Sequence, residues 1–317
     1  MKHFKGRAAA LLSVLGFISL VSCSGGTSYV GTGGGTSGGT TYKVTVETST
    51  NGGVAADKTT GVAEGEKITL TVTPETGYKL DALTVKDGGS NAVSTTEVTE
   101  GTSYTFKMPA SNVTVSATFK AMLGSKASPD AVGDIVFKDG SAEPYTADLT
   151  DAQKQAAVAV IFDATKKLGV GLVQGTGLAW ATGTTGRTTK FNTSETDGSG
   201  NWDVIKAADS TGAAAAATNY PAFNFANTYG VSVAGNADDW YLPAKDELKN
   251  LCDNYRASGS AVKEALDKCT GTIDLSTGCF WSSCQYASVD NNARLLNFSN
   301  GGWIRPLRGL RIRHSPI

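Results

Sequence analysis

The sequence has few histidines, little charge and almost no cysteine before its last quarter. Two histidines among 317 residues, His3 and His314, argue against a histidine base or a metal site with several histidine ligands. Charged residues make up 18% of the chain and the formal net charge is −1, so the basic excess that favours nucleic-acid binding is missing. We therefore expect no metal ion, no cofactor and no nucleic-acid partner.

Cysteine is divided between the two ends of the chain. One cysteine, Cys23, lies near the N-terminus, and four more follow late in the sequence: Cys252, Cys269, Cys279 and Cys284. In an oxidising compartment these four have several possible disulfide connectivities, and the sequence does not choose among them.

The first 22 residues have the layout of an export signal. Lys2, Lys5 and Arg7 form a positive start, and the apolar stretch 8–21 that follows is shorter than the roughly 20 residues of a membrane-spanning helix. The signal ends in Leu20-Val21-Ser22-Cys23, which resembles the lipobox of bacterial lipoproteins. This resemblance implies a cleaved signal over residues 1–22 and a lipidated Cys23 that anchors an exported protein to the outer membrane, at the cell surface. The alternative is an ordinary signal with an incidental cysteine.

The mature chain is expected to begin with a flexible tether and a small all-β domain. Residues 23–41 consist almost wholly of Gly, Ser and Thr, which cannot bury a core. Residues 42–120 then show apolar and polar side chains alternating with period two, as in half-buried strands. The segments Asn51–Val54, Thr73–Leu80 and Phe106–Ala110 resemble the divergent internalin-type B-repeat of bacterial surface proteins. This resemblance implies a stalk domain, with direct ligand binding as the alternative.

After a linker over residues 121–128, residues 129–317 are expected to form one α+β domain. Thr150 with Gln153 forms a capping box that starts a short helix. Strands are predicted over 133–137, 157–162, 169–173 and 178–180, with a continuation of the helix as the alternative for 157–162. Residues 181–219, rich in Gly, Thr and Asn, are predicted as a long surface loop. Pro243 is placed to open a helix whose apolar face carries the residues Leu248, Leu251, Cys252 and Tyr255.

Four motifs of this domain form a recognisable set. They are Val132–Val136, Asp239–Leu248, Phe280–Ser283 and Leu310–Arg313. Their order and spacing resemble the C-type lectin fold of the formylglycine-generating-enzyme type. That fold implies core packing for the residues Trp240, Leu242, Trp281 and Ile312.

The segment 284–310 contains no Lys, Glu, Met or His and shows no apolar periodicity. Its composition resembles the variable region of proteins diversified by retroelements, such as the variable proteins of Treponema, in which mutated asparagine codons give a restricted set of residues. The resemblance implies an exposed ligand-binding patch formed by Cys284, Tyr286, Val289, Asp290, Arg294, Leu295, Asn297, Trp303, Ile304, Pro306, Leu307 and Gly309. Gln285 and Trp303 lie outside the restricted set. The expected ligand is a protein or a glycan on a host or neighbouring cell.

Two other functions stay open at this point. Formylglycine-generating enzymes use cysteine chemistry in the same fold, but Cys279 and Cys284 have no nearby histidine, and a catalytic cysteine needs a fixed environment that lowers its pKa. A generic, non-variable carbohydrate-binding domain is the other possibility, although the usual calcium-dependent sugar motif is missing. We therefore expect passive ligand binding, with no catalytic residues.

Overall fold

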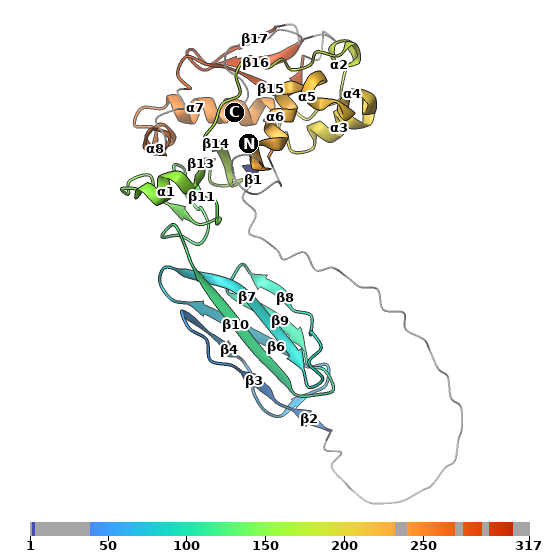
Figure 1. Cartoon of the computed structure of the whole chain (residues 1–317), viewed down its shortest axis with the longest axis vertical. Helices are drawn as coiled ribbons and strands as arrows, with labels where there is room; N and C mark the ends of the chain where they lie inside the picture. The colour runs from blue at the N-terminus through green and yellow to red at the C-terminus, as the bar shows by residue number, and fades with distance from the viewer. Residues whose placement is uncertain (1, 4–38, 232–239, 270–274, 287–291, 307–317) are drawn as a thin grey trace, which may run out of the picture. The chain divides into compact units, whose positions relative to one another are not determined.

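A computed structural model places the chain in two compact units that divide between Ala121 and Met122. We call residues 39–121 the N-terminal unit, and β1 together with the residues from 122 onward the C-terminal unit. Figure 1 labels the helices and strands of the two units, other than β5 and β12. No helix among the described residues is long and apolar enough to cross a membrane. The structure describes residues 2–3, 39–231, 240–269, 275–286 and 292–306.

The N-terminal unit is built from strands alone, as the alternating sequence predicts. Its strands are β2 (Thr41–Tyr42), β3 (Val44–Val46), β4 (Gly52–Ala56), β5 (Val62–Ala63), β6 (Lys67–Pro74), β7 (Tyr78–Asp87), β8 (Thr96–Thr99), β9 (Ser103–Lys107) and β10 (Val113–Ala121). One sheet has the order β4-β6-β9-β8, a second has the order β3-β10-β7, and β2 pairs with β5. Strand β10 pairs in parallel with β3 and antiparallel with β7.

The core of the N-terminal unit lies between these two sheets. Ile68 and Leu70 of β6 are completely buried and meet Val85 and Val115 of the other sheet in one cluster. Burying aliphatic side chains of this size contributes about 1.5–3 kcal/mol each. Alternate residues of β6 stay exposed, and this explains the period-two pattern.

The C-terminal unit opens with a sheet of order β1-β14-β13-β11-β12. Its central strand β13 is buried along almost its whole length, with Val160 and Phe162 in one core cluster and Ile161 in another. A strand that is covered on both faces has a continuous run of apolar residues in its sequence. The strand predicted over 157–162 is confirmed as β13. The elements of this part are β1 (Lys2–His3), β11 (Ile135–Phe137), β12 (Ala142–Glu143), α1 (Asp151–Ala156), β13 (Ala157–Asp163) and β14 (Leu168–Gly171).

Strand β1 pairs antiparallel with β14, with Lys2 opposite Gly169 and His3 opposite Leu168. Both β1 residues fall in the segment that the sequence predicts to be cleaved. In a processed chain β14 would therefore form the edge of this sheet.

Two predictions between residues 178 and 219 are wrong. The expected surface loop contains α2 (Thr184–Thr188), α3 (Asn201–Ala208), α4 (Ser210–Ala214) and α5 (Ala216–Asn219), followed by α6 (Pro221–Tyr229). These helices are too short and too rich in Gly and Thr for a clear period, yet Phe191, Ile205 and Tyr220 bury themselves in a shared core. Residues 178–180 form no strand, and Trp180 is instead an anchor of that core. Tertiary packing, and not a local sequence pattern, therefore determines the structure of both segments.

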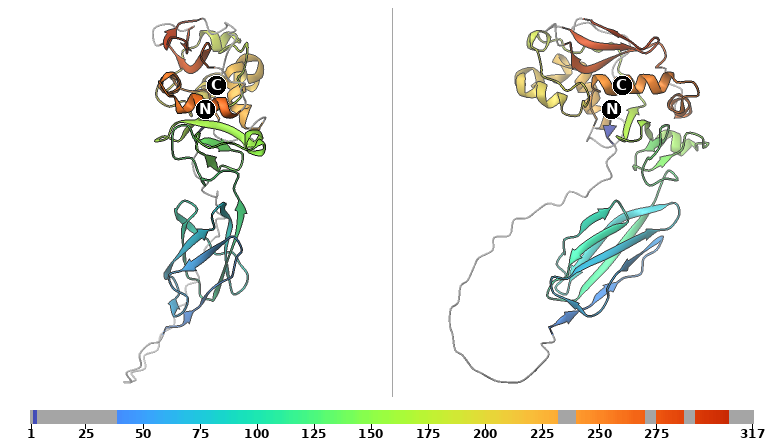
Figure 2. Two further views of the ribbon diagram at one scale, coloured as in Figure 1. Left: turned by 90° about the vertical axis from the view of Figure 1, so that its left-hand side faces the viewer. Right: turned by 180° about the vertical axis from the view of Figure 1, so that it is seen from behind.

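The last part of the unit packs helices against a second sheet. Its elements are α7 (Lys245–Arg256), α8 (Ala261–Cys269), β15 (Cys279–Gln285), β16 (Ala293–Asn297) and β17 (Gly302–Ile304), and the sheet order is β15-β16-β17. Figures 1 and 2 show α7 lying along this sheet, with α2 to α6 gathered beside it. The predicted apolar face of α7, Leu248 to Tyr255, is buried there. The chain is thus a mixed α+β protein with an N-terminal β unit.

Candidate functional site

Strand β15 is the scaffold of the candidate site, and it is buried on both faces. Phe280 joins the core cluster of α7, whereas Trp281 joins the cluster of α3 and α6. The Trp281 indole N–H donates to the Leu178 carbonyl at 3.0 Å, and the Trp180 indole donates to the Ser282 carbonyl at 2.9 Å. These contacts fix β15 against residues 178–180, the segment that was predicted as a strand.

Two of the sequence motifs meet at Ser283. Its main-chain N–H donates to the Pro243 carbonyl at 2.7 Å, and its hydroxyl donates to the same oxygen at 3.1 Å. The side-chain amide of Asn201 donates to the Ser283 hydroxyl at 2.7 Å. Trp240, Leu242 and Trp281 are buried as predicted, while Ile312 lies outside the described residues. The Trp-Tyr-Leu-Pro and Trp-Ser-Ser segments therefore form one packed scaffold.

The N-terminus of α7 is held by a buried carboxylate. Glu247 accepts hydrogen bonds from the Ala244 N–H at 2.8 Å, the Tyr241 hydroxyl at 3.0 Å and the Gly198 N–H at 3.1 Å. Three donors satisfy a side chain that is only 3% exposed. This arrangement places Lys245, at the start of α7, beside the end of β15.

Cys284 does not lie on an exposed patch, contrary to the prediction. It is fully buried, its thiol donates to the Ser194 carbonyl at 3.0 Å, and it accepts the Lys245 N–H at 3.2 Å. Burial raises the pKa of this thiol. The reason is that β15 stays in the core as far as Gln285, whose side chain bonds to the main chain of Thr189 and Phe191.

Leu295 and Pro306 are also buried, so neither side chain faces outward. Leu295 is 3% exposed and packs in the cluster of Trp281 and Leu242. Along β16 its neighbour Arg294 is partly exposed, as expected where a strand alternates between its two faces. The prediction of an exposed patch therefore fails at Cys284, Leu295 and Pro306, which serve packing, and also at Tyr286, which is 6% exposed.

Two of the predicted residues, Tyr286 and Arg294, do come together, and Arg305 joins them. The guanidinium carbon of Arg294 lies 4.5 Å from the centre of the Tyr286 ring, and that of Arg305 lies 4.6 Å from the same point. Both distances fit cation–π contacts. The Tyr286 hydroxyl donates to the Ile304 carbonyl at 3.2 Å and so links the end of β15 to β17. Tyr286 itself is 6% exposed and acts as a support for the two arginines.

Two residues that the sequence did not indicate complete this group. Glu195 accepts from Arg294 Nη2 at 2.6 Å and forms an ion pair with Lys245 Nζ. The hydrogen bonds from Lys245 and Arg294 lower the pKa of the Glu195 carboxyl, and Glu195 in turn raises the pKa of Lys245. We call Glu195, Lys245, Tyr286, Arg294 and Arg305 the Tyr286 cluster. Glu195 lay in the predicted loop, where no pattern singled it out.

The remaining described candidates differ in exposure. Ile304 is 40% exposed, whereas Trp303 packs partly against the core cluster of α7. Asn297 accepts from the Ser299 N–H at 2.8 Å and from the Ser299 hydroxyl at 2.6 Å, which closes the turn after β16. Asn297 thus has a structural role in addition to any contact with ligand.

Several predicted residues lie outside the described part of the chain, and nothing about their placement follows. They are Cys23, Val289, Asp290, Leu307 and Gly309.

The chemistry of metal sites and of activated thiols finds no support in the described residues. Within those ranges no group of three or more His, Cys, Asp or Glu side chains is arranged to hold a metal ion. The four late cysteines are free thiols. Burial raises their pKa values, in the case of Cys269 to about 12, so they are protonated at neutral pH. A protonated thiol is a poor nucleophile.

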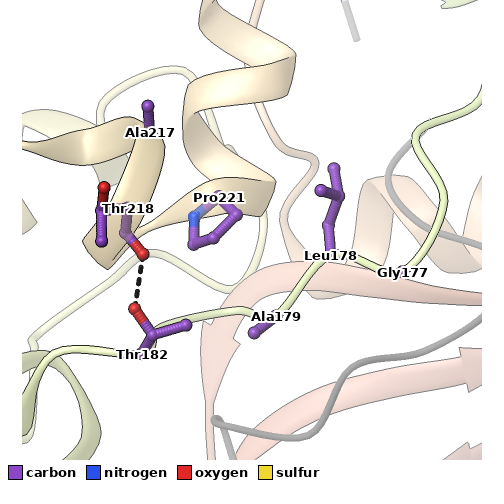
Figure 3. A pocket seen from close by; sticks show the side chains of 7 residues that line it. All are labelled: Gly177, Leu178, Ala179, Thr182, Ala217, Thr218 and Pro221. Atoms are coloured by element: carbon purple, nitrogen blue, oxygen red, sulfur yellow. Dashed lines mark hydrogen bonds between the residues drawn. The ribbon is translucent and has the colours of Figure 1, made fainter.

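One hollow of about 490 Å³, drawn in Figure 3, shares no lining residue with the Tyr286 cluster. Leu178, Ala179 and Pro221 line it, and the Thr182 hydroxyl donates to the Thr218 carbonyl at its side. Its seven lining residues include no titratable side chain. The side chains that line the hollow therefore offer no acid or base for acid–base chemistry.

Comparison with known proteins identifies the N-terminal unit. The sequence model of the divergent InlB B-repeat domain matches residues 42–123, so the B-repeat prediction is confirmed for this segment. Among solved structures, a fimbrial protein from Bacteroides ovatus is similar with a TM-score of 0.41 and 13% sequence identity. The alignment covers 85% of this chain and 66% of the fimbrial protein. No curated protein matches the chain.

Proposed function

We propose that the chain is an exported lipoprotein that displays a passive ligand-binding domain at the cell surface, as a receptor or adhesin. In this proposal residues 1–22 are a signal, Cys23 carries the lipid, and residues 23–41 form a tether. The N-terminal unit acts as a stalk, in keeping with its match to a B-repeat. The C-terminal unit is a C-type lectin-fold domain that binds a protein or a glycan.

The observation that carries the proposal is the Tyr286 cluster. Tyr286, Arg294 and Arg305 come from three different segments, yet both guanidiniums lie within 4.6 Å of one ring centre. Ile304, which is next to Arg305, is partly exposed. Exposed side chains on a backbone that strands hold in place lower the ordering cost of binding.

The proposed ligand face consists of Arg294, Trp303, Ile304 and Arg305, and the buried Tyr286 ring supports the two guanidiniums. Cys284, Leu295 and Pro306 support it from within, and Asn297 shapes the turn behind it. The proposal also keeps four residues on the basis of their positions in the segment 284–310 alone: Val289, Asp290, Leu307 and Gly309.

Binding is tested with the full chain on a glycan array and against a phage-displayed library of random peptides. Selected binders are measured again with the double variant Ile304→Ser/Arg305→Ser and with the control Arg187→Ser, an exposed arginine on α2. We expect at least a tenfold loss of affinity for the double variant and no change for the control. Binders whose affinity for the double variant equals that for the wild type, or an absence of binders, would refute the proposed face.

Retroelement diversification is tested in the gene. We propose an adenine-rich near-copy of the segment that encodes residues 284–310, beside a reverse transcriptase gene. Substitutions between sibling genes should fall at codons 286, 294 and 304 more often than at codons 281–283, because the latter encode the buried scaffold. Absence of the near-copy would leave a non-variable domain with a fixed ligand.

The lipid anchor is tested by metabolic labelling with radioactive palmitate. The wild-type chain should take up label and float with outer-membrane vesicles, and Cys23→Ser should do neither. Surface protease accessibility of intact cells then separates outward display from an anchor on the inner leaflet.

The rival enzyme function has its own probe, a peptide with an unmodified cysteine of the kind that formylglycine-generating enzymes oxidise. We expect no aldehyde product. Raised thiol pKa values at Cys279 and Cys284 favour this outcome, because a cysteine enzyme needs a thiolate. Aldehyde formation that disappears in Cys279→Ala would instead support the enzyme.

A further inference from the structure

The two arginines of the Tyr286 cluster differ in their charge partners. Arg294 is 16% exposed and its charge is paired with Glu195 at 2.6 Å. Arg305 is exposed, and it forms no ion pair with any residue in the described ranges. Within the described part of the chain, the exposed guanidinium of Arg305 therefore has no carboxylate partner.

The surroundings of Arg305 favour an anion. Both guanidinium carbons lie within 4.6 Å of one ring centre, so they are separated by no more than about 9 Å, roughly one Debye length at physiological ionic strength. Glu195 is shared between Arg294 and Lys245, and Asp246 lies 3.4 Å from Lys245. Counted over the residues that the structure describes, three cations and two carboxylates leave one net positive charge at this place.

Arg305 is also held in place before any ligand arrives. Its side chain rests on the Tyr286 ring, and its own main-chain carbonyl accepts a hydrogen bond from the Asn292 side chain at 3.0 Å. The preceding carbonyl, that of Ile304, accepts from the Tyr286 hydroxyl. A planar guanidinium that is already ordered loses little entropy when it binds a carboxylate with two parallel hydrogen bonds.

The neighbours of Arg305 favour a protein over a sugar. A sugar ring typically needs an open aromatic face, but the Tyr286 ring is 6% exposed and already has two guanidiniums over it. Ile304, the residue before Arg305, is 40% exposed and offers an aliphatic side chain, whereas Trp303 packs partly against the core cluster of α7 on the other face of β17. An arginine next to aliphatic and aromatic groups is typical of protein–protein contacts.

Resting on the proposed function, we propose that Arg305 is the specificity-determining residue of this face and that it binds an aspartate or glutamate of a protein partner. An apolar residue next to that acidic residue packs on Ile304. The ligand class is thus an acidic–apolar protein segment, bound through a carboxylate.

The test uses the full chain and the peptides that it selects from the random phage library. We expect the enriched peptides to carry an acidic residue next to an apolar one. Changing that acid to its amide should weaken binding at least tenfold, as should Arg305→Gln, and the two changes combined should cost little more than either alone. The affinity of Arg305→Lys should fall between those of the wild type and Arg305→Gln, because an ammonium keeps the charge but cannot form the two parallel hydrogen bonds. Arg187→Gln is the matched control and should bind like the wild type.

The outcomes separate this inference from the proposed function. Peptides that need Ile304 but tolerate the acid-to-amide change overturn the carboxylate assignment and leave the binding face intact. Selective binding of acidic glycans on the array, with no peptide that depends on Arg305, also overturns it. If no selected binder depends on the residues of this face, both the carboxylate assignment and the proposed binding face are refuted.

Discussion

Arg294 donates a hydrogen bond from Nη2 to Glu195 Oε1 at 2.6 Å, across 99 positions of the sequence. The same carboxylate pairs with Lys245 at the start of α7. One side chain from the segment between β14 and α6 therefore connects β16 to α7. This link holds the Tyr286 cluster together, because Arg294 and Tyr286 are in contact.

Replacing Glu195 by glutamine tests that link. The pair is partly exposed, at 16% for Arg294 and 40% for Glu195, so solvent screening limits its contribution to about 1 kcal/mol of the free energy of unfolding. All five tryptophans lie between residues 180 and 303, so tryptophan fluorescence during urea unfolding follows the C-terminal unit alone. Asp203→Asn, which removes an exposed pair with Lys206, is the control and should have no measurable effect.

Acid should abolish the difference between Glu195→Gln and the wild type. The pKa of Glu195 is lowered in the folded chain, mainly by the Lys245 hydrogen bond, so its stabilisation is present above the ordinary carboxyl pKa of 4.5. The stabilisation is lost as the pH falls through the lowered value. Urea curves of the two proteins should separate at pH 7 and converge near the acid limit. A constant gap across this range would contradict an ionic role.

Strand pairing offers a sharp test of which predicted site residues are core. Leu295 and Ile304 are register partners on β16 and β17, but they are 3% and 40% exposed. Leu295→Ala should lower the free energy of unfolding by about 2–5 kcal/mol, as expected where a buried leucine leaves a cavity. Ile304→Ala should change it by less than about 1 kcal/mol and should reduce peptide binding instead. Equal effects of the two changes on stability would contradict the division into support and binding face.

The sequence predicted the fold where local patterns are strong. Alternation along 67–72 predicted a strand, and the spacing of Leu248 and Leu251 predicted the buried face of α7, because one repeating pattern determines each burial. The segment 181–219 failed because its helices owe their burial to residues such as Phe191 and Ile205, which no local period marks.

The sequence indicated several residues of the candidate site, but it did not predict which of them are exposed to solvent. The composition of 284–310 gave no sign that Cys284 and Leu295 are buried while Arg305 is open, because both classes of side chain occur in the same irregular run. The roles of Glu195 and Lys245 could not be predicted, because both join the site through contacts with residues distant in the sequence.

Two glycines with the same backbone strain differ in the space around them. Gly133 has φ of 88° and Gly140 has φ of 82°, so alanine is strained at both positions. At Gly133 a new Cβ would lie 2.7 Å from the Tyr145 ring and 2.8 Å from the Ala261 side chain, whereas nothing lies within 4 Å at Gly140. Gly140→Ala should cost about 1 kcal/mol, and Gly133→Ala should cost a further 1–3 kcal/mol for the overpacking. Urea unfolding followed by fluorescence measures the difference, and equal costs would place the clash in doubt.

The four late thiols should be protected from alkylation in the folded chain. Burial raises the pKa of Cys269 to about 12 and raises the pKa values of Cys252, Cys279 and Cys284 as well, so the reactive thiolate is scarce at pH 8. Cys279 is less buried than the other three and should react first with iodoacetamide. Because a raised thiol pKa contributes stability below the ordinary value of 9.0 and loses it at higher pH, labelling and unfolding should both accelerate above pH 9. Peptide mapping by mass spectrometry identifies the order, and rapid labelling of Cys284 at pH 7 without unfolding would contradict its packed position against Ser194 and Lys245.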